Sequence, residues 1–504
     1  MLISIIKKNS FKLFAGTSLL LVFLPFSREP IQADDLSGYA SVIQINGNLG
    51  VLAGFQNWIA LQFETTSHFL PFGWTFQWIQ YTFVDFVSKS LNAGFILTWT
   101  SANLLIISLL SYFTIRNFVS GLSKFANQND PLMIDKKCAY VSLLLASLVT
   151  IHSPWSIEPF ASHLAYGLLT TFLFSLIYLF TTEMISRNCQ NQTNKIAIKF
   201  AIVSTLGLCT YDLFISLLFI SSILAILYLK LTGPSLEKRN FKNLTLLFFG
   251  VVYPLLFFIF TRKINQVPEY EGTKLLINTQ NVKAVFFGIA STFQPTGTFK
   301  AIQVFNAPIT LHLSGILISL LLIIQVQVFM RFAHTPTLPR LTTGYYLYST
   351  CYFVTLSFVV VATQVFNERW GVYIAQIGNI YLFYSTTLLL AVCLIGFLSY
   401  EFLAETQPKI LHIGVTSILL VSVIVSTNTN WTVLKRDVRN PGTDLIALAY
   451  DISTTELERC TAEKKFLEIG YPESYSGNVL NSVRSFGNRN IGAEFCRFSD
   501  VKGK

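Results

Sequence analysis

The chain alternates long apolar runs with short polar segments, and this alternation is its strongest pattern. Most of the runs approach the roughly 20 residues that a helix needs to cross a bilayer. Backbone groups inside a bilayer must be hydrogen-bonded within the protein, so such runs indicate helices. The pattern therefore predicts an all-α polytopic membrane protein with about eleven transmembrane helices. The expected spans are Leu13–Phe26, Leu91–Ile115, Ala139–Ile151, Phe160–Thr181, Ile196–Thr210, Leu213–Leu229, Leu244–Phe260, Ala307–Met330, Gly344–Phe366, Gly378–Leu398 and Ile410–Thr427.

The first apolar run has two interpretations. Lys7, Lys8 and Lys12 precede the run, and the letters "IQA" before Asp34 resemble a signal-peptide cleavage site. The run also leads straight into a polytopic protein. We therefore favour an uncleaved first span, with the N-terminus in the cytoplasm.

Two segments between spans are long, and a polar tail follows the last span. The segment from Asp34 to Lys89 is aromatic and poor in charge, so we expect a long first outer loop with interfacial helices. Arg262–Phe305 is expected as a second outer loop. The predicted organisation is a transmembrane domain over residues 1–427 and a small C-terminal extracytoplasmic domain over residues 428–504. The tryptophans expected to anchor the interface are Trp58, Trp74, Trp78 and Trp155.

Composition and charge agree with a membrane protein. The 504 residues are 52% hydrophobic and 12% charged, whereas about 25% of residues are charged in soluble domains. The net charge of +10 does not indicate nucleic-acid binding, because the basic residues gather in short loops between apolar runs. This positive-inside pattern places those loops in the cytoplasm. The loop residues are Lys124, Lys136, Lys137, Arg187, Lys195, Lys199, Lys230, Lys238, Arg239, Lys242, Arg331 and Arg340.

The seven cysteines show no metal-ligand spacing. Five of them lie in or beside apolar runs, where cysteine packs as a small hydrophobe. Those five are Cys138, Cys189, Cys209, Cys351 and Cys393. Cys460 and Cys496 lie in the polar tail, and they can pair if the tail is outside the cytoplasm.

Ionisable residues at the predicted outer ends of the spans are the candidates for chemistry, because such groups are costly at a membrane boundary. Asp34 and Asp35 follow the first span after a short polar segment. Two adjacent carboxylates can raise one of their two pKa values, which suits a general base near neutral pH. The alternative for the pair is an ordinary solvated loop.

Two further predicted outer segments carry candidate residues, and with the acidic pair they form a set of three motifs in a fixed order along the chain. The turn "IHSPWSIEPF" carries His152, Pro154 and Glu158, and the later segment "NERWGVYIAQIGN" carries Arg369. This set resembles the GT-C membrane glycosyltransferases. These relatives have "DD" after the first helix, then a turn reading roughly H-P-x-x-x-E, and later an acidic-Arg-aromatic element.

The resemblance extends from Leu13 to about Leu398, with two departures. Ser153 is inserted between the histidine and the proline. The Lys-Glu turn that is common in the family is replaced by "TYD", with Asp212 alone. The tail after the last span matches no family pattern.

The resemblance implies transfer of a sugar from a polyprenyl-phosphate donor to a glycan, lipid or protein acceptor at the outer face of the cytoplasmic membrane. Asp34 or Asp35 would act as the general base. Arg369 would bind the lipid phosphate, unless it only pairs with Glu368. The remaining expected substrate-binding residues are Glu158, His152 and His68. Glu158 has an alternative role as a helix cap, and His152 has one as a structural residue.

Two other functions stay open at this point. A secondary transporter or a flippase of lipid-linked sugars would also be polytopic, but it usually places ionisable residues near the membrane midplane. A non-catalytic assembly protein would use its outer loops to bind a cell-wall partner. No cofactor is implied with certainty. A divalent metal is an open alternative, but two aspartates do not complete a metal site.

Overall fold

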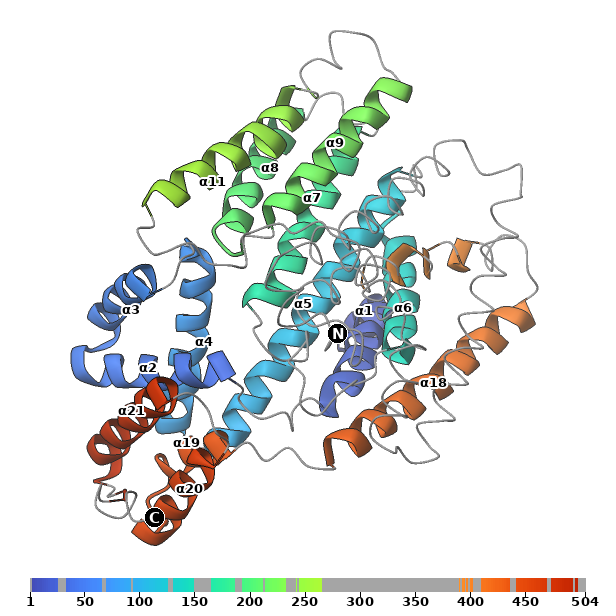
Figure 1. Ribbon diagram of the computed structural model, residues 1–504. Coiled ribbons are helices and arrows are strands. Elements are labelled where there is room, and N and C mark those ends of the chain that lie inside the picture. Colours follow the sequence, from blue (N-terminus) through green and yellow to red (C-terminus); the bar gives the residue numbers. More distant parts are fainter. Residues whose placement is uncertain are drawn as a thin grey trace, which may run out of the picture.

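The structure is a computed structural model in which every regular element of the described residues is a helix (Figure 1). The predicted helical class is therefore confirmed for that part of the chain. The described residues are 2–25, 33–65, 69–91, 94–125, 130–148, 165–185, 193–211, 214–232, 242, 244–264, several positions between 389 and 401, 409–435, 441–468, 473–492, 495 and 496.

One group of helices, the apolar bundle, contains the described apolar runs. Its members are α1 (Leu2–Phe23), α5 (Phe95–Phe125), α6 (Pro131–Leu148), η2 (Ala165–Leu169), α7 (Thr170–Ile185), α8 (Thr193–Leu208), α9 (Phe214–Thr232), η3 (Phe248–Val252), α11 (Tyr253–Ile264) and α18 (Lys409–Lys435). Three stretches of the described chain are long and apolar enough to cross a membrane, namely Phe95–Lys124, Gly167–Ile185 and Leu244–Thr261. The spans expected at Ala307–Met330 and Gly344–Phe366, and most of Gly378–Leu398, lie outside the described residues.

The helices of the bundle differ in length from the expected spans. Helix α5 has 31 residues and continues through Lys124, well past the expected end at Ile115. Lys136 and Lys137 lie within α6. The prediction that these three lysines lie in a loop is therefore wrong, because the flanking helices extend into the polar segment and carry the basic residues on their ends.

Ion pairs gather where α5 ends and α6 begins. Lys12 of α1 lies 3.5 Å from Asp135 of α6. Lys124 of α5 pairs with Glu183 of α7, and the buried Lys137 pairs with Glu401. Because only a short connection joins α5 to α6, all three pairs lie at the same end of the bundle.

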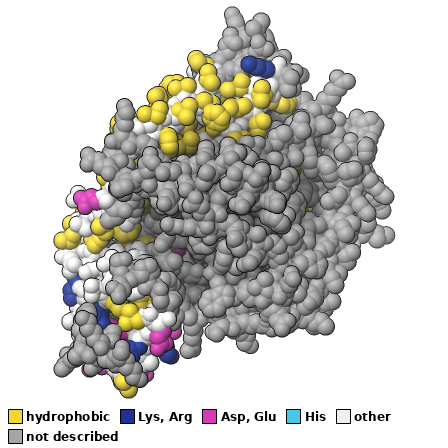
Figure 2. Space-filling view, viewed as in Figure 1, with side chains coloured by type: hydrophobic (Ala, Val, Ile, Leu, Met, Phe, Trp, Pro, Cys, Tyr) yellow, Lys and Arg dark blue, Asp and Glu magenta, His cyan; other side chains and the backbone are white. Residues whose placement is uncertain are grey.

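One face of the bundle is apolar and exposed. Leu255, Leu256, Ile259 and Phe260 on α11 are 45–60% exposed. Figure 2 shows hydrophobic side chains covering this helix in the upper part of the view. A helix that turns such residues outward is suited to contact with lipid.

A second group of helices, the two-segment unit, combines a segment that follows α1 with the C-terminal segment. Its first segment is α2 (Ala33–Leu49), α3 (Val51–Thr65) and α4 (Pro71–Ser90), and its second is α19 (Pro441–Leu448), α20 (Glu456–Leu467) and α21 (Glu473–Ile491). Figure 1 shows these helices together beside the first turns of α5. Both segments contribute to one apolar core, for example through Tyr39 and Ile43 of α2 and Leu445 and Val483 of the C-terminal helices. The expected outer loop and the expected C-terminal domain thus share a core.

Local sequence explains several boundaries in this unit. Gly50 separates α2 from α3 with φ of +76°, a conformation that glycine adopts without strain. Pro71 begins α4, where its missing N–H costs no helical hydrogen bond. Thr455 and Glu458 form a reciprocal capping box at the start of α20.

The C-terminal segment carries the expected disulfide. Cys460 and Cys496 are bonded, with their Cα atoms 4.7 Å apart. Next to them, Arg484 of α21 donates two hydrogen bonds of 2.7 and 2.6 Å to Glu463 of α20, whose side chain is fully buried. The disulfide joins α20 to the chain just after α21, and the bidentate ion pair joins α20 to α21 itself.

Two of the tryptophans expected at the membrane interface are instead buried. Trp58 and Trp74 are 2% and 1% exposed. The Trp58 indole donates a hydrogen bond of 3.1 Å to the Trp74 carbonyl, which joins α3 to α4. The interface prediction is wrong for these two residues because α3 and α4 pack against each other. Trp78 packs on Phe55 with ring centroids 5.0 Å apart, and Trp155 lies outside the described residues.

Candidate functional site

Of the six residues expected in the site, Asp35 is the one whose side chain the structure describes. Asp34 precedes it on α2, where the backbone alone is described. The other four expected site residues lie outside the described residues, and they are His68, His152, Glu158 and Arg369. Their convergence with the acidic pair stays a prediction.

Asp35 lies in the first turn of α2, where the positive end of the helix dipole favours a carboxylate. The side chain is 7% exposed. Its Oδ1 atom accepts a hydrogen bond of 2.6 Å from the hydroxyl of Tyr81 on α4. Gly38, one turn further along α2, makes room for this contact, since a Cβ there would lie 3.0 Å from the Tyr81 ring.

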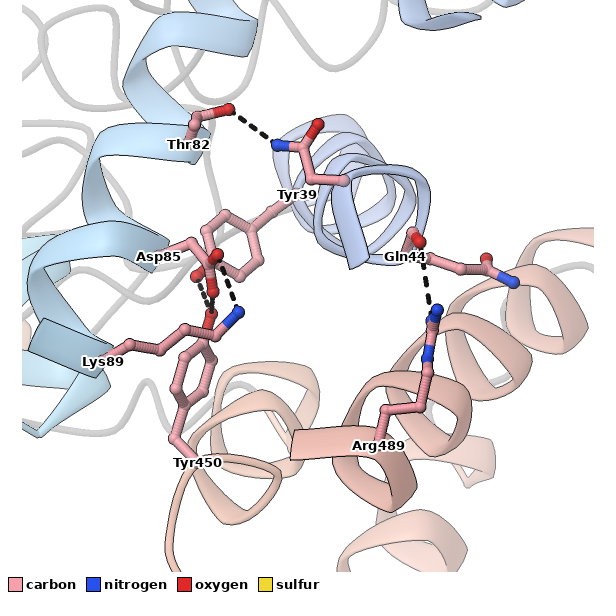
Figure 3. A network of polar contacts seen from close by, with 8 residues as sticks. Tyr39, Gln44, Thr82, Asp85, Lys89, Tyr450 and Arg489 are labelled. Atoms are coloured by element: carbon pink, nitrogen blue, oxygen red, sulfur yellow. Dashed lines mark hydrogen bonds and ion pairs between the residues drawn. The ribbon is translucent and has the colours of Figure 1, made fainter. Parts of the chain in front are cut away.

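A second polar connection lies one turn away. The Tyr450 hydroxyl donates a hydrogen bond of 2.7 Å to Oδ1 of Asp85 on α4. Because this bond uses the single proton of Tyr450, the hydroxyl of Tyr39 on α2 donates to Tyr450. Lys89 donates to the other Asp85 oxygen at 2.9 Å. Figure 3 shows these four side chains meeting between α2, α4 and the residues after α19.

The environment keeps both tyrosine hydroxyls protonated. Burial raises the pKa of Tyr39 well above its ordinary value, and the nearby Asp85 charge raises it further. Burial likewise raises the pKa of Tyr450, with further contributions from Tyr39 and Asp85. Both hydroxyls are therefore hydrogen-bond donors throughout the neutral range.

The two connections are related by helix geometry. Asp35 and Tyr39 are four residues apart on α2, and Tyr81 and Asp85 are four residues apart on α4, so each pair lies on one face of its helix. Asp35 faces Tyr81, and Tyr39 reaches Asp85 through Tyr450. We call this arrangement the carboxylate–tyrosine ladder, with Asp35–Tyr81 as its first rung and Tyr39–Tyr450–Asp85 as its second.

Aromatic rings surround the ladder. Tyr81 stacks on Trp99 with centroids 6.1 Å apart, and Tyr450 stacks on Phe95 at 5.4 Å. Tyr39 meets Phe95 at 5.1 Å. In such a poorly hydrated environment hydrogen bonds are stronger, and an unpaired polar group is more costly.

Sequence reasoning singled out Asp35 but missed Tyr39, Tyr81, Asp85 and Tyr450. For three of these a signal exists. The spacings Asp35-x-x-x-Tyr39 and Tyr81-x-x-x-Asp85 carry the same two residue types in opposite order, at an interval that places side chains on one face of a helix. Tyr450 has no comparable local signal, because its partners are about 365 and 411 residues away in sequence.

The described residues contain no group of three or more histidine, cysteine or acidic side chains placed to hold a metal ion. Comparison with known proteins found no matching family model, no matching characterised protein and no matching solved structure.

Proposed function

We propose that the chain is a multi-pass membrane glycosyltransferase with its general base in the Asp34–Asp35 pair. It would move a sugar from a polyprenyl-phosphate donor to an acceptor at the outer face of the cytoplasmic membrane. The observation that carries the proposal is the setting of Asp35. This carboxylate lies in the first turn of the first helix after α1, and it is buried and hydrogen-bonded to Tyr81.

Topology supports the proposed orientation. The basic helix ends and their ion pairs lie at one end of the bundle, which suits the cytoplasm. The two-segment unit contacts the other end, because the backbone N–H groups of Phe72 and Gly73 donate to the Cys209 carbonyl just after α8. The Cys460–Cys496 disulfide in that unit suits an oxidising, extracytoplasmic compartment. We propose about eleven spans in total, as the apolar runs predict.

The first outer segment also suits a position at the membrane interface. Ile79, Phe83 and Phe86 form one apolar stripe on α4, and they are 54%, 55% and 65% exposed. Residues at this spacing lie along one side of a helix. Insertion of this stripe into the outer leaflet would hold the acidic pair near the level of lipid phosphates.

The chemistry requires these residue types. The acceptor hydroxyl attacks the anomeric carbon, the bond from that carbon to the phosphate oxygen breaks, and the lipid phosphate leaves with the negative charge. A carboxylate takes the acceptor's proton. The Tyr81 hydroxyl orients the Asp35 carboxylate. Arg369 is proposed to stabilise the leaving phosphate, and Glu158, His152 and His68 are proposed to bind the substrates.

The test uses purified protein in proteoliposomes with a panel of polyprenyl-phosphate hexoses and pentoses, and it measures release of polyprenyl phosphate. Asp→Asn is nearly isosteric but cannot accept the proton. At the catalytic position it should therefore lower turnover by about a hundredfold or more. Asp135→Asn is the matched control, because it makes the same change at the opposite end of the bundle.

Three results would contradict the proposal. Full transfer by Asp34→Asn, by Asp35→Asn and by the double variant would place the base elsewhere. Movement of intact donor across the bilayer without release of polyprenyl phosphate would identify a flippase. Neither release nor movement with any donor of the panel would favour a non-catalytic assembly protein.

A further inference from the structure

We propose that Tyr450 is a positioning residue through which the C-terminal segment fixes the register of α2, and thereby the place of the acidic pair. This inference rests on the proposed function. Its geometric basis is the second rung of the ladder, in which the Tyr450 hydroxyl lies between Tyr39 of α2 and Asp85 of α4.

The ladder specifies how α2 lies along α4. Each residue advances a helix by about 1.5 Å, so a slip of one residue would move a hydrogen-bonding atom by half the length of its bond. Asp35 and Tyr39 are on the same face of α2, and a slip would therefore disturb both rungs together. Only the second rung depends on a residue from the C-terminal segment.

The same segment holds α2 at a second place. Ser482 of α21 donates a hydrogen bond of 2.6 Å to the Gln44 side chain. Arg489, also on α21, donates a hydrogen bond to the Asn48 side chain. Figure 3 shows its second contact, which is with the Gln44 carbonyl at 3.5 Å. Tyr450 contacts the first half of α2 and α21 contacts the second half, so the C-terminal segment can set both the position and the direction of α2.

The contacts of the Tyr450 ring separate its packing role from its hydroxyl role. The ring stacks on Phe95 and lies 4.8 Å from the Phe486 ring between centroids. Lys89, which also pairs with Asp85, lies 4.6 Å from the centroid of the same Phe486 ring. A phenylalanine at position 450 would keep these apolar contacts and remove only the hydroxyl of the second rung.

A polar connection of this kind is well suited to specify one arrangement. Hydrophobic packing alone tolerates small shifts between helices, whereas a buried hydrogen-bond network requires one geometry to satisfy its members. Reaction rates depend on such geometry, since a displacement of about 1 Å at reacting groups can cost about a hundredfold. The ladder thus gives the C-terminal segment a direct influence on the acidic pair.

The experiment compares full-length Tyr450→Phe with the unsubstituted protein in lipid nanodiscs by hydrogen exchange and by transfer kinetics. Amides in the first half of α2 should exchange at least about fivefold faster. Turnover should fall by about tenfold or more, with the Michaelis constant for the donor unchanged. Tyr112→Phe on α5 is the matched control, because it also removes one buried hydroxyl, and that hydroxyl has no hydrogen-bond partner in the described structure.

A second variant guards against a folding defect. Asp85→Asn keeps a carbonyl oxygen to accept from Tyr450 but loses the charge, so its effects should be smaller than those of Tyr450→Phe. Unchanged α2 exchange in Tyr450→Phe would overturn the inference. Faster α2 exchange with full turnover would also overturn it, because the register would then not matter to the reaction.

Failure of the inference can be told from failure of the proposed function. If Asp34→Asn and Asp35→Asn abolish transfer while Tyr450→Phe leaves it intact, the proposed function stands and the positioning role falls. If the unsubstituted protein transfers no sugar, the proposed function falls and takes the positioning role with it. In that case the exchange data still show whether Tyr450 holds α2.

Discussion

Removal of the Cys460–Cys496 disulfide should loosen the C-terminal segment. The two cysteines are 36 residues apart in sequence, and in the chain-entropy model a cross-link over a loop of this length stabilises the folded state by about 4 kcal/mol. A folded segment the size of residues 441–496 typically has a stability of roughly 3–8 kcal/mol. Loss of the cross-link should therefore remove half of that stability or more, and should raise the open fraction by about a thousandfold.

Hydrogen exchange on the full-length protein measures this opening. In Cys460→Ser/Cys496→Ser, amides of α20 should exchange faster by about two to three orders of magnitude. Some order should persist, because the Arg484–Glu463 ion pair remains. Amides of α7, in the core of the apolar bundle, should exchange at the unchanged rate and serve as the internal control.

A change in α20 of less than about threefold would refute this reasoning. It would show that packing against α2, rather than the cross-link, determines the stability of the segment. A reductant added to the unsubstituted protein should reproduce the double variant. The same reductant should have no further effect on the double variant, and any further loosening would reveal a contribution from another disulfide.

Two more predictions concern pH and helix packing. Because the pKa values of Tyr39 and Tyr450 are raised, the folded protein holds protons that the unfolded chain releases above the ordinary tyrosine pKa of 10.0. This stabilisation is complete below pH of about 10 and is lost as the pH rises further. Amide hydrogen exchange in α2 should therefore accelerate in alkaline solution. The acceleration should be smaller in the double variant Tyr39→Phe/Tyr450→Phe, which lacks both hydroxyls. An equal acceleration in that variant would assign the effect to other groups. Gly250→Ala should destabilise the protein by about 1–3 kcal/mol, because the new Cβ would overlap Ser222 of α9. The control is Gly414→Ala, whose new Cβ would have no atom within 4 Å. This variant should be neutral or stabilising by up to about 1 kcal/mol. Thermal unfolding in detergent compares the two variants, and equal effects would exclude close packing at Gly250.

The helices of the apolar bundle were predictable because hydrophobic runs report burial in lipid or protein directly. The expected span Leu213–Leu229 nearly coincides with α9, and Ile196–Thr210 nearly coincides with α8. Helix ends were less predictable. Helix α18 was expected to end at Thr427 but continues to Lys435, because a helix persists into polar sequence as long as no residue breaks it.

The joint core of the two-segment unit could not be read from the sequence. Periodicity indicates which face of a helix is buried but not against which partner. The buried positions Tyr39, Ala40 and Ile43 have helical spacing on α2, yet their partners on α19 and α21 are about 400 residues away. The cysteine pair was different, since compartment and composition restricted the candidates to Cys460 and Cys496.

The sequence singles out a candidate site residue only where its residue type is unusual for its place in the chain. A pair of carboxylates after an apolar run is conspicuous, and Asp35 is indeed buried and hydrogen-bonded. Tyrosine is common at membrane interfaces, so Tyr81 and Tyr39 did not stand out among 21 tyrosines. Their roles depend on which helix faces which, and that is decided by tertiary packing.

The place of Asp35 between two cores connects the fold to the proposed reaction. The core of the apolar bundle includes Phe23 at the end of α1, and the core of the two-segment unit begins with Leu36. Along the chain, Asp35 thus lies between a residue of the apolar bundle's core and a residue of the two-segment unit's core. Under the proposed function, this would be the depth at which a lipid phosphate meets an aqueous acceptor. A flexible loop here would let the carboxylate sample many positions, and the rate advantage of a fixed base would be lost. A packed unit built from two segments far apart in the sequence removes that freedom. Under the proposed function, the C-terminal segment is therefore part of the catalytic apparatus, although its residues need never touch the substrate.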